Sequence, residues 1–287
     1  MPQVTVGVSL KAYFGRREAR TWFGRVAELV REHDAVRAAR VDVFVIPTYL
    51  QIQDALASFA GTGVRIGAQD VSPYPAGPYT GEISAAELQE SGVELAEVGH
   101  AERRRLFGET DEITAAKVAA ALEHGIVPVL CLGEADRLGS EDAARATVQQ
   151  LHADLAGAPD GAVIVAYEPV WAIGAPEPAP VEHITTVTRA LRDALDALPC
   201  RAGSLVIYGG SAGPGLLTRL GGDVDGLFLG RFAHDADSLL AVLDEASALA
   251  SSRQTARLQP RVETVGGTRS LDTQVQSRGR GTGGGAA

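Results

Sequence analysis

A single carboxylate stands where a buried strand ends. Residues 163–166 form an apolar run, typical of a strand buried on both faces of a parallel sheet, and Glu168 follows almost at once. Pro169 then ends the strand, because proline has no backbone N–H to donate. The apolar segment 170–173, which closes with Gly174, is too short for a helix and predicts a loop that covers the site. The pattern favours a general base acting on a substrate shielded from water; the alternative is an ordinary surface acid.

Two more residues at strand ends could take part in proton transfer. His100 follows a predicted strand and precedes a run that can begin a helix. We expect the helix N–H groups and dipole to lower the imidazole pKa and keep it neutral, ready to donate a hydrogen bond to a carbonyl. Lys11 follows the first predicted strand, and apart from Lys117 every other basic residue is Arg, which indicates a need for a compact charge. The alternatives are a structural histidine and an ordinary surface lysine.

Three glycine-containing strand or loop ends could hold a phosphate. They are Gly174 on the covering loop, the run Gly209-Gly210-Ser211, and the pair Gly230-Arg231. Each alone is typical of a simple turn. Together they match a common phosphate site, in which backbone N–H groups near the last two strands of a barrel bind an anion.

The elements that must position these residues form eight strand-then-helix units. The strands are predicted at 4–8, 41–46, 64–68, 95–98, 127–132, 163–166, 205–208 and 227–229. Such alternation predicts a single (β/α)₈ barrel over residues 1–250. A doubly wound open sheet is the alternative, but it needs a crossover point that nothing in the sequence marks. In a barrel, Ser9, Lys11, His100, Glu168, Ser211 and Gly230 would converge at one mouth.

Two stretches resemble signatures of the triosephosphate isomerase family. They are Tyr-Glu-Pro-Val-Trp-Ala-Ile-Gly at 167–174 and Val-Gly-His-Ala-Glu-Arg-Arg at 98–104. The resemblance extends over about residues 4 to 249. It implies an isomerase that interconverts a ketose phosphate and an aldose phosphate, such as dihydroxyacetone phosphate and glyceraldehyde 3-phosphate, through an enediolate.

The resemblance also assigns roles to individual residues. Glu168 would remove the proton next to the carbonyl, His100 would polarise the carbonyl, and Lys11, braced by Glu102, would add positive charge. The phosphate would be held at Gly174, Ser211, Gly230 and the backbone N–H of Arg231. Neither a cofactor nor a metal is implied, and the six histidines show no paired ligand spacing.

Several positions depart from the family pattern. Ser9 stands where the family has Asn, Ala101 where it has Ser, and Arg231 where it has Gly. The hinge 174–178 reads Gly-Ala-Pro-Glu-Pro, whereas the triose enzyme has Gly-Thr-Gly-Lys. The Gly230-Arg231 pair and the altered hinge resemble the branch of the family that acts on tetrulose phosphates. The sequence therefore leaves open a triose phosphate, a tetrulose phosphate and a non-catalytic phosphate-binding barrel.

Composition bounds the partners and the compartment. The net charge of −10 argues against general nucleic-acid binding, and no apolar run is long enough for a membrane helix. Two cysteines and no visible signal peptide predict a reducing cytoplasm. The expected partner is a small sugar phosphate. The loop 77–82 resembles the arm that reaches into a neighbouring subunit in the family, which predicts a homodimer.

The C-terminal stretch 251–287 differs in kind from the rest. It is rich in Ser, Arg, Gln, Thr and Gly, and its six Arg stand against only Glu263 and Asp272. We expect it to be disordered and dispensable for activity, because it cannot bury a core. A functional basic tail is the alternative.

Overall fold

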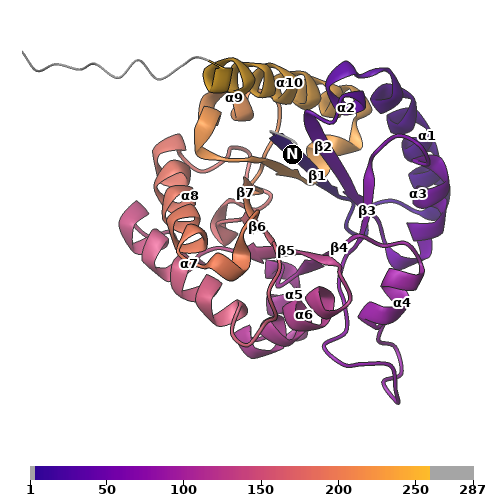
Figure 1. Ribbon diagram of the computed structural model, residues 1–287, viewed down its shortest axis with the longest axis vertical. Coiled ribbons are helices and arrows are strands. Elements are labelled where there is room, and N and C mark those ends of the chain that lie inside the picture. The colour runs from indigo at the N-terminus through magenta and orange to yellow at the C-terminus, as the bar shows by residue number, and fades with distance from the viewer. Residues whose placement is uncertain (1–3, 259–287) are drawn as a thin grey trace, which may run out of the picture.

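Eight parallel strands close into a barrel in the computed structural model, which describes residues 4–258 (Figure 1). The strands are β1 (Val4–Ser9), β2 (Val41–Ile46), β3 (Arg65–Ala68), β4 (Leu95–Val98), β5 (Val127–Leu132), β6 (Ile164–Tyr167), β7 (Leu205–Tyr208) and β8 (Gly226–Leu229). Each strand pairs with the next in the chain, and β8 pairs with β1 to close the ring. The predicted (β/α)₈ barrel is therefore confirmed, and every strand's carboxyl end faces the same mouth.

Helices surround the strands as an outer layer (Figure 1). The α-helices and short 3₁₀ helices (η) are α1 (Arg16–Glu32), α2 (Asp34–Arg37), η1 (Tyr49–Gln51), α3 (Ile52–Ser58), α4 (Ala85–Glu90), α5 (Ala101–Phe107), α6 (Asp111–Glu123), α7 (Ser140–Asp154), η2 (Val170–Ala172), α8 (Val181–Asp196), η3 (Pro199–Arg201), α9 (Leu216–Leu220), η4 (Gly221–Asp223), η5 (Arg231–His234) and α10 (Ala236–Leu258). Within residues 4–258 no helix is both long and apolar enough to cross a membrane.

The core has two parts, one between strands and helices and one inside the barrel. The inner part is almost wholly apolar and consists of Phe44, Ile46, Leu95, Val129, Cys131, Ile164, Ala166, Ile207 and Phe228. Gly7 makes room for the largest of these, since a Cβ there would lie 2.0 Å from the Phe44 ring. This packed interior lies beneath the side chains at the mouth and supports them.

The last helix extends further than the sequence indicated. The apolar pattern predicted an end near Leu249 and a tail from residue 251, but α10 continues to Leu258. Arg253 donates hydrogen bonds to the carbonyls of Gly221 and Val224, at 3.2 and 2.6 Å. Residues 251–258 therefore belong to the folded chain. The rest of the predicted tail lies outside the described residues.

Candidate active site

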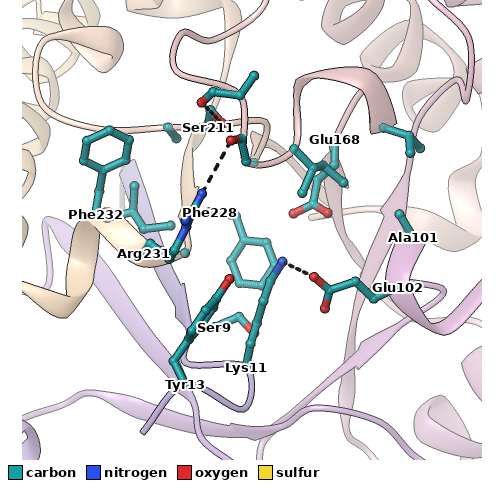
Figure 2. Close-up of a pocket in the computed structure, with 18 of the residues that line it drawn as sticks. Ser9, Lys11, Tyr13, Ala101, Glu102, Glu168, Ser211, Phe228, Arg231 and Phe232 are labelled. Carbon is teal, nitrogen blue, oxygen red and sulfur yellow. Dashed lines mark hydrogen bonds and ion pairs between the residues drawn. The ribbon is translucent and has the colours of Figure 1, made fainter. Parts of the chain in front are cut away.

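The residues singled out in the sequence converge on one cavity at the mouth of the barrel (Figure 2). Its volume is about 670 Å³. Seven of the eight predicted site residues line it: Ser9, Lys11, Glu168, Gly174, Ser211, Gly230 and Arg231. The eighth, His100, is only 3% exposed and lies against Glu168.

Glu168 follows β6 directly and is buried, with 6% of its surface exposed. Its Oε2 lies 3.2 Å from Nε2 of His100, and no donor within residues 4–258 meets this oxygen with hydrogen-bond geometry. Gly209 leaves the space for the carboxylate, because a Cβ there would lie 2.4 Å from Oε1 of Glu168. The oxygen is therefore placed to take a proton from a substrate carbon beside it.

His100 caps the N-terminus of α5. Its Nδ1 accepts a hydrogen bond from the backbone N–H of Glu102 at 3.1 Å, so the proton of the neutral ring sits on Nε2, toward the cavity. Burial lowers the pKa of His100, but the charges of Glu168 and Glu97 outweigh it and raise the pKa to about 9. The expected lowering is therefore wrong for the empty site, because the carboxylate of Glu168 rests against the imidazole.

Lys11 extends from the end of β1 across the cavity, and the predicted contact with Glu102 is present (Figure 2). Its Nζ lies 3.0 Å from Oε1 of Glu102. Burial lowers the pKa of Lys11, but Glu168 and Glu102 more than offset this and the pKa is raised, so the side chain stays charged. The backbone of Lys11 has φ 46°, a left-handed conformation that is costly for a side chain of this size. Gln69 donates to its carbonyl at 2.9 Å.

The predicted covering loop contains η2 and is held from below by Glu134. This buried carboxylate accepts hydrogen bonds from Trp171 Nε1 at 2.9 Å and from the Tyr167 hydroxyl at 3.0 Å. His183 Nε2 lies 2.9 Å from the same carboxylate. Through Glu134, which follows β5, the Trp171 indole is therefore linked to Tyr167 on β6 and to His183 on α8.

The far side of the loop is fastened to the end of β7. The Ser211 hydroxyl lies within hydrogen-bond distance of the carbonyls of Ala172 and Ala175, at 2.8 and 2.9 Å. The Ala179 N–H donates to the Tyr208 hydroxyl at 3.1 Å. The loop therefore lies over the cavity. Since the Ser211 hydroxyl is engaged by the loop, only its backbone N–H remains to contact a phosphate.

The predicted phosphate end of the cavity is built largely from backbone. Gly174 has φ 73° and Ser211 φ 52°, left-handed conformations of the kind found in backbone anion sites. Arg231 begins η5 after Gly230, and its side chain runs along the cavity toward the loop (Figure 2). Its Nη2 donates a long hydrogen bond of 3.4 Å to the carbonyl of Gly174.

Sequence reasoning missed two buried acids. Glu134 was visible only as the residue after a strand. Glu97, inside β4, was hidden in a predicted strand, although it accepts a hydrogen bond from the Ser9 hydroxyl at 2.8 Å and its Oε1 lies 3.9 Å from His100 Nε2. A charged residue within a short, otherwise apolar strand that should be buried on both faces was the available signal.

The model of the family described as triosephosphate isomerase matches residues 4–246 of this chain. The chain belongs to the triosephosphate isomerase family. The reaction class of that family, isomerisation of a sugar phosphate, is therefore also that of this chain. The sequence-based predictions of family, fold and reaction class are confirmed.

Individual relatives of this triosephosphate isomerase family member carry two names. The L-erythrulose-1-phosphate isomerase of Pectobacterium atrosepticum is 45% identical over 87% of this chain and 98% of its own length. The triosephosphate isomerase of Thermus thermophilus is 37% identical over 85% of this chain and 98% of its own. The crystal structure of triosephosphate isomerase from Bartonella henselae superposes with a TM-score of 0.72 at 24% identity, over 85% and 98% of the two chains. At that identity the structure supports the fold alone.

Proposed function

We propose that Glu168, His100 and Lys11 isomerise a ketose phosphate through an enediolate. The observation that carries this proposal is the buried Glu168 Oε2, which no donor among the described residues meets with good geometry and which lies 3.2 Å from a ring nitrogen that carries a proton. Glu168 removes the proton from the carbon next to the substrate carbonyl and returns it to the neighbouring carbon. The two oxygens exchange roles, so the carbonyl moves by one carbon.

His100 and Lys11 stabilise the negative charge that forms on the oxygens. The Nε2 proton of His100 is directed to the cavity because Nδ1 already accepts from the Glu102 N–H. When the substrate displaces Glu168 from the ring, the largest of the effects that raise the His100 pKa is removed, which favours the neutral ring with its proton on Nε2. This proton is then donated to the substrate oxygen instead. Lys11, whose Nζ is fixed by Glu102, adds a positive charge that needs no rearrangement during the reaction.

The phosphate is held at the opposite end, by the backbone N–H groups of Gly174, Ser211, Gly230 and Arg231. This end supplies binding and the loop excludes water, which keeps the enediolate from eliminating phosphate. The anchoring of the loop by Glu134 and Tyr208 supports that role.

The favoured substrate is a four-carbon ketose phosphate, L-erythrulose 1-phosphate. Ser9 and Ala101, both small, line the cavity where the family has Asn and Ser, and leave room for one more carbon. The 45% identical relative is named for that substrate. With four carbons, removal of the C3 proton and its return to C2 moves the carbonyl from C2 to C3, whereas with three carbons the same step gives an aldehyde.

The test is kcat/KM for L-erythrulose 1-phosphate and dihydroxyacetone phosphate on one preparation. A higher value for the tetrulose is expected. A higher value for the triose would assign the chain to the second candidate, the triose activity for which the Thermus thermophilus relative is named. Turnover of neither, with inorganic phosphate still bound, would favour a non-catalytic barrel.

We also infer a homodimer. The loop between β3 and α4 extends beyond the ring of helices (Figure 1). It carries Tyr74 and Tyr79, whose stacked rings have centroids 4.4 Å apart and which are 49% and 38% exposed. Leu50, Leu106 and Phe107 are also exposed, by 85%, 65% and 65%. A dimer that covers these side chains would remove their apolar surface from water, which favours association. Light scattering at working concentration should give twice the chain mass; a fully active monomer would contradict the inference.

A further inference from the structure

Glu97 is a buried acid that the proposed chemistry leaves without a role. It lies on β4, its side chain points into the barrel as that of Leu95 does two residues earlier, and it is 4% exposed. Every member of the apolar cluster inside the barrel is a hydrocarbon or a thiol. Burial raises the pKa of Glu97, and Glu168 raises it further, whereas His100 and the Ser9 hydrogen bond lower it; the net direction is upward. Burying such a group costs stability, which indicates that it is retained for function.

Glu97 contacts two residues of the candidate site, Ser9 and His100. Its Oε2 accepts a hydrogen bond from the Ser9 hydroxyl at 2.8 Å, and Ser9 lines the cavity. Its Oε1 lies 3.9 Å from Nε2 of His100. Within residues 4–258 no lysine or arginine forms an ion pair with it; Lys11 is paired with Glu102. The direct contacts of Glu97 are therefore with Ser9 and His100, and not with a network of ion pairs.

The hydrogen bond to Glu97 decides what Ser9 can offer a substrate. A serine hydroxyl has one proton and two lone pairs. Because the proton is given to Glu97, only lone pairs face the cavity. Ser9 is thus an acceptor for a substrate hydroxyl, whereas an asparagine at this position would present amide donors suited to a carbonyl oxygen.

The place of this acceptor in the cavity matches the extra hydroxyl of a four-carbon substrate. The proposed phosphate end is formed by the loops after β6, β7 and β8. Ser9 ends β1, the neighbour of β8, but its hydroxyl donates to Glu97 on β4, the strand opposite β8 in the ring. A substrate with its phosphate at the first end directs its last carbon toward the Ser9–Glu97 pair. Ala101, also from the β4 side, leaves space there.

We propose that Glu97 is a positioning residue for substrate choice, which orients the Ser9 hydroxyl so that it accepts a hydrogen bond from the terminal hydroxyl of a four-carbon ketose phosphate. The inference rests on the proposed function. It assigns the preference to a pair of residues, one of which never touches the substrate.

Three variants test the pair through the ratio of kcat/KM for L-erythrulose 1-phosphate to that for dihydroxyacetone phosphate. Glu97→Leu should lower the ratio about tenfold, the effect of one lost hydrogen bond. Glu97→Gln should keep it within about threefold, since the amide oxygen still accepts from Ser9. Ser9→Ala should lower it as Glu97→Leu does, and the double variant should show no further fall, because the two residues act as one unit.

Thermal midpoints separate this role from a structural one. Glu97→Leu should keep or raise the midpoint while the ratio falls, since a buried acid is replaced by an apolar side chain. Val129, which faces Glu97 in the β4–β5 register, gives the matched control: Val129→Ala should lower the midpoint and leave the ratio unchanged.

The outcomes that overturn the two proposals differ. A wild-type preference for the triose overturns the proposed substrate. A wild-type preference for the tetrulose that survives in Glu97→Leu overturns the role of Glu97 alone. A ratio that falls equally in Glu97→Gln and Glu97→Leu, or additively with Ser9→Ala, also overturns that role.

Discussion

The two ends of the cavity are made from different parts of the chain. At the proposed proton-transfer end, Glu168, His100 and Lys11 present side-chain atoms. Glu168 lies against His100 and Lys11 is held by Glu102, both contacts between distant segments, whereas the backbone two residues on holds the His100 ring. At the proposed phosphate end, Gly174 and Ser211 present backbone in left-handed conformations. Side-chain substitutions should therefore have different effects at the two ends. At the proton-transfer end a new side chain removes the reacting group, whereas at the phosphate end most backbone contacts remain.

The largest effect is expected at the base. Glu168→Gln keeps the shape of the side chain but cannot take a proton, so kcat should fall by about 10³-fold or more, within the range for loss of a general base. Glu168→Asp withdraws the carboxylate by about 1 Å and should cost about 10²-fold. Kinetics and a thermal scan check both variants. Near-wild-type activity in Glu168→Asp, with an unchanged midpoint, would remove Glu168 from this role.

The raised pKa of His100 predicts how stability of the empty enzyme depends on pH. A group whose pKa rises from 6.5 unfolded to about 9 folded stabilises fully below pH 6.5 and loses that contribution as pH rises toward 9. The thermal midpoint should therefore decline over this window. In His100→Gln this part of the decline should disappear. An identical pH profile in both proteins would mean that the imidazole binds no extra proton in the folded state.

A smaller effect is expected at the phosphate end. Arg231→Ala keeps the backbone N–H and loses only the 3.4 Å hydrogen bond to Gly174 and a nearby charge. KM should rise by about threefold with kcat nearly unchanged, since an exposed long contact contributes little. Gly174→Ala, which strains a backbone with φ 73°, is the matched comparison and should raise KM more. A kcat loss of 10²-fold in Arg231→Ala would show that its side chain belongs to the chemistry.

The smallest effects are expected at the C-terminus. A chain that ends at Leu258 should keep both its activity and its thermal midpoint, because α10 remains whole. One that ends at Ala250 loses the Arg253 hydrogen bonds to Gly221 and Val224, and its midpoint should fall by a few degrees. Equal midpoints for the two truncations would show that Arg253 does not fasten the helix.

The same contrast explains what the sequence could predict. Glu168, His100 and Lys11 were recognisable because each closely follows a strand, and the ends of eight strands converge in a closed barrel. The carbonyls that occupy the Ser211 hydroxyl could not be foreseen, because they depend on where the loop rests. The pKa of His100 moved against expectation for a similar reason, since the sequence does not say which charge lies against the ring.

The sequence did not reveal the buried acid Glu97 for a different reason. A strand pattern tells which residues share a face, but Glu97 and its partner Ser9 are 88 residues apart and meet only across the interior. The end of α10 was missed because the stretch after residue 250 has no apolar periodicity. Its folded part is fastened by an arginine that donates to backbone carbonyls, a contact that composition does not reveal.

The pairing of β8 with β1 also has a consequence for biosynthesis. These strands are the last and first to be made, and Thr5 aligns with Gly226, where a Cβ would lie 1.6 Å from the Thr5 carbonyl oxygen. Until the ribosome has delivered β8, β1 lacks one neighbour and the ring stays open. Ring closure therefore depends on contacts between residues far apart in the chain, a kind that forms slowly. Ser9 ends β1 and Lys11 follows it. We therefore expect a growing chain to have no partial activity until the first strand pairs with the last.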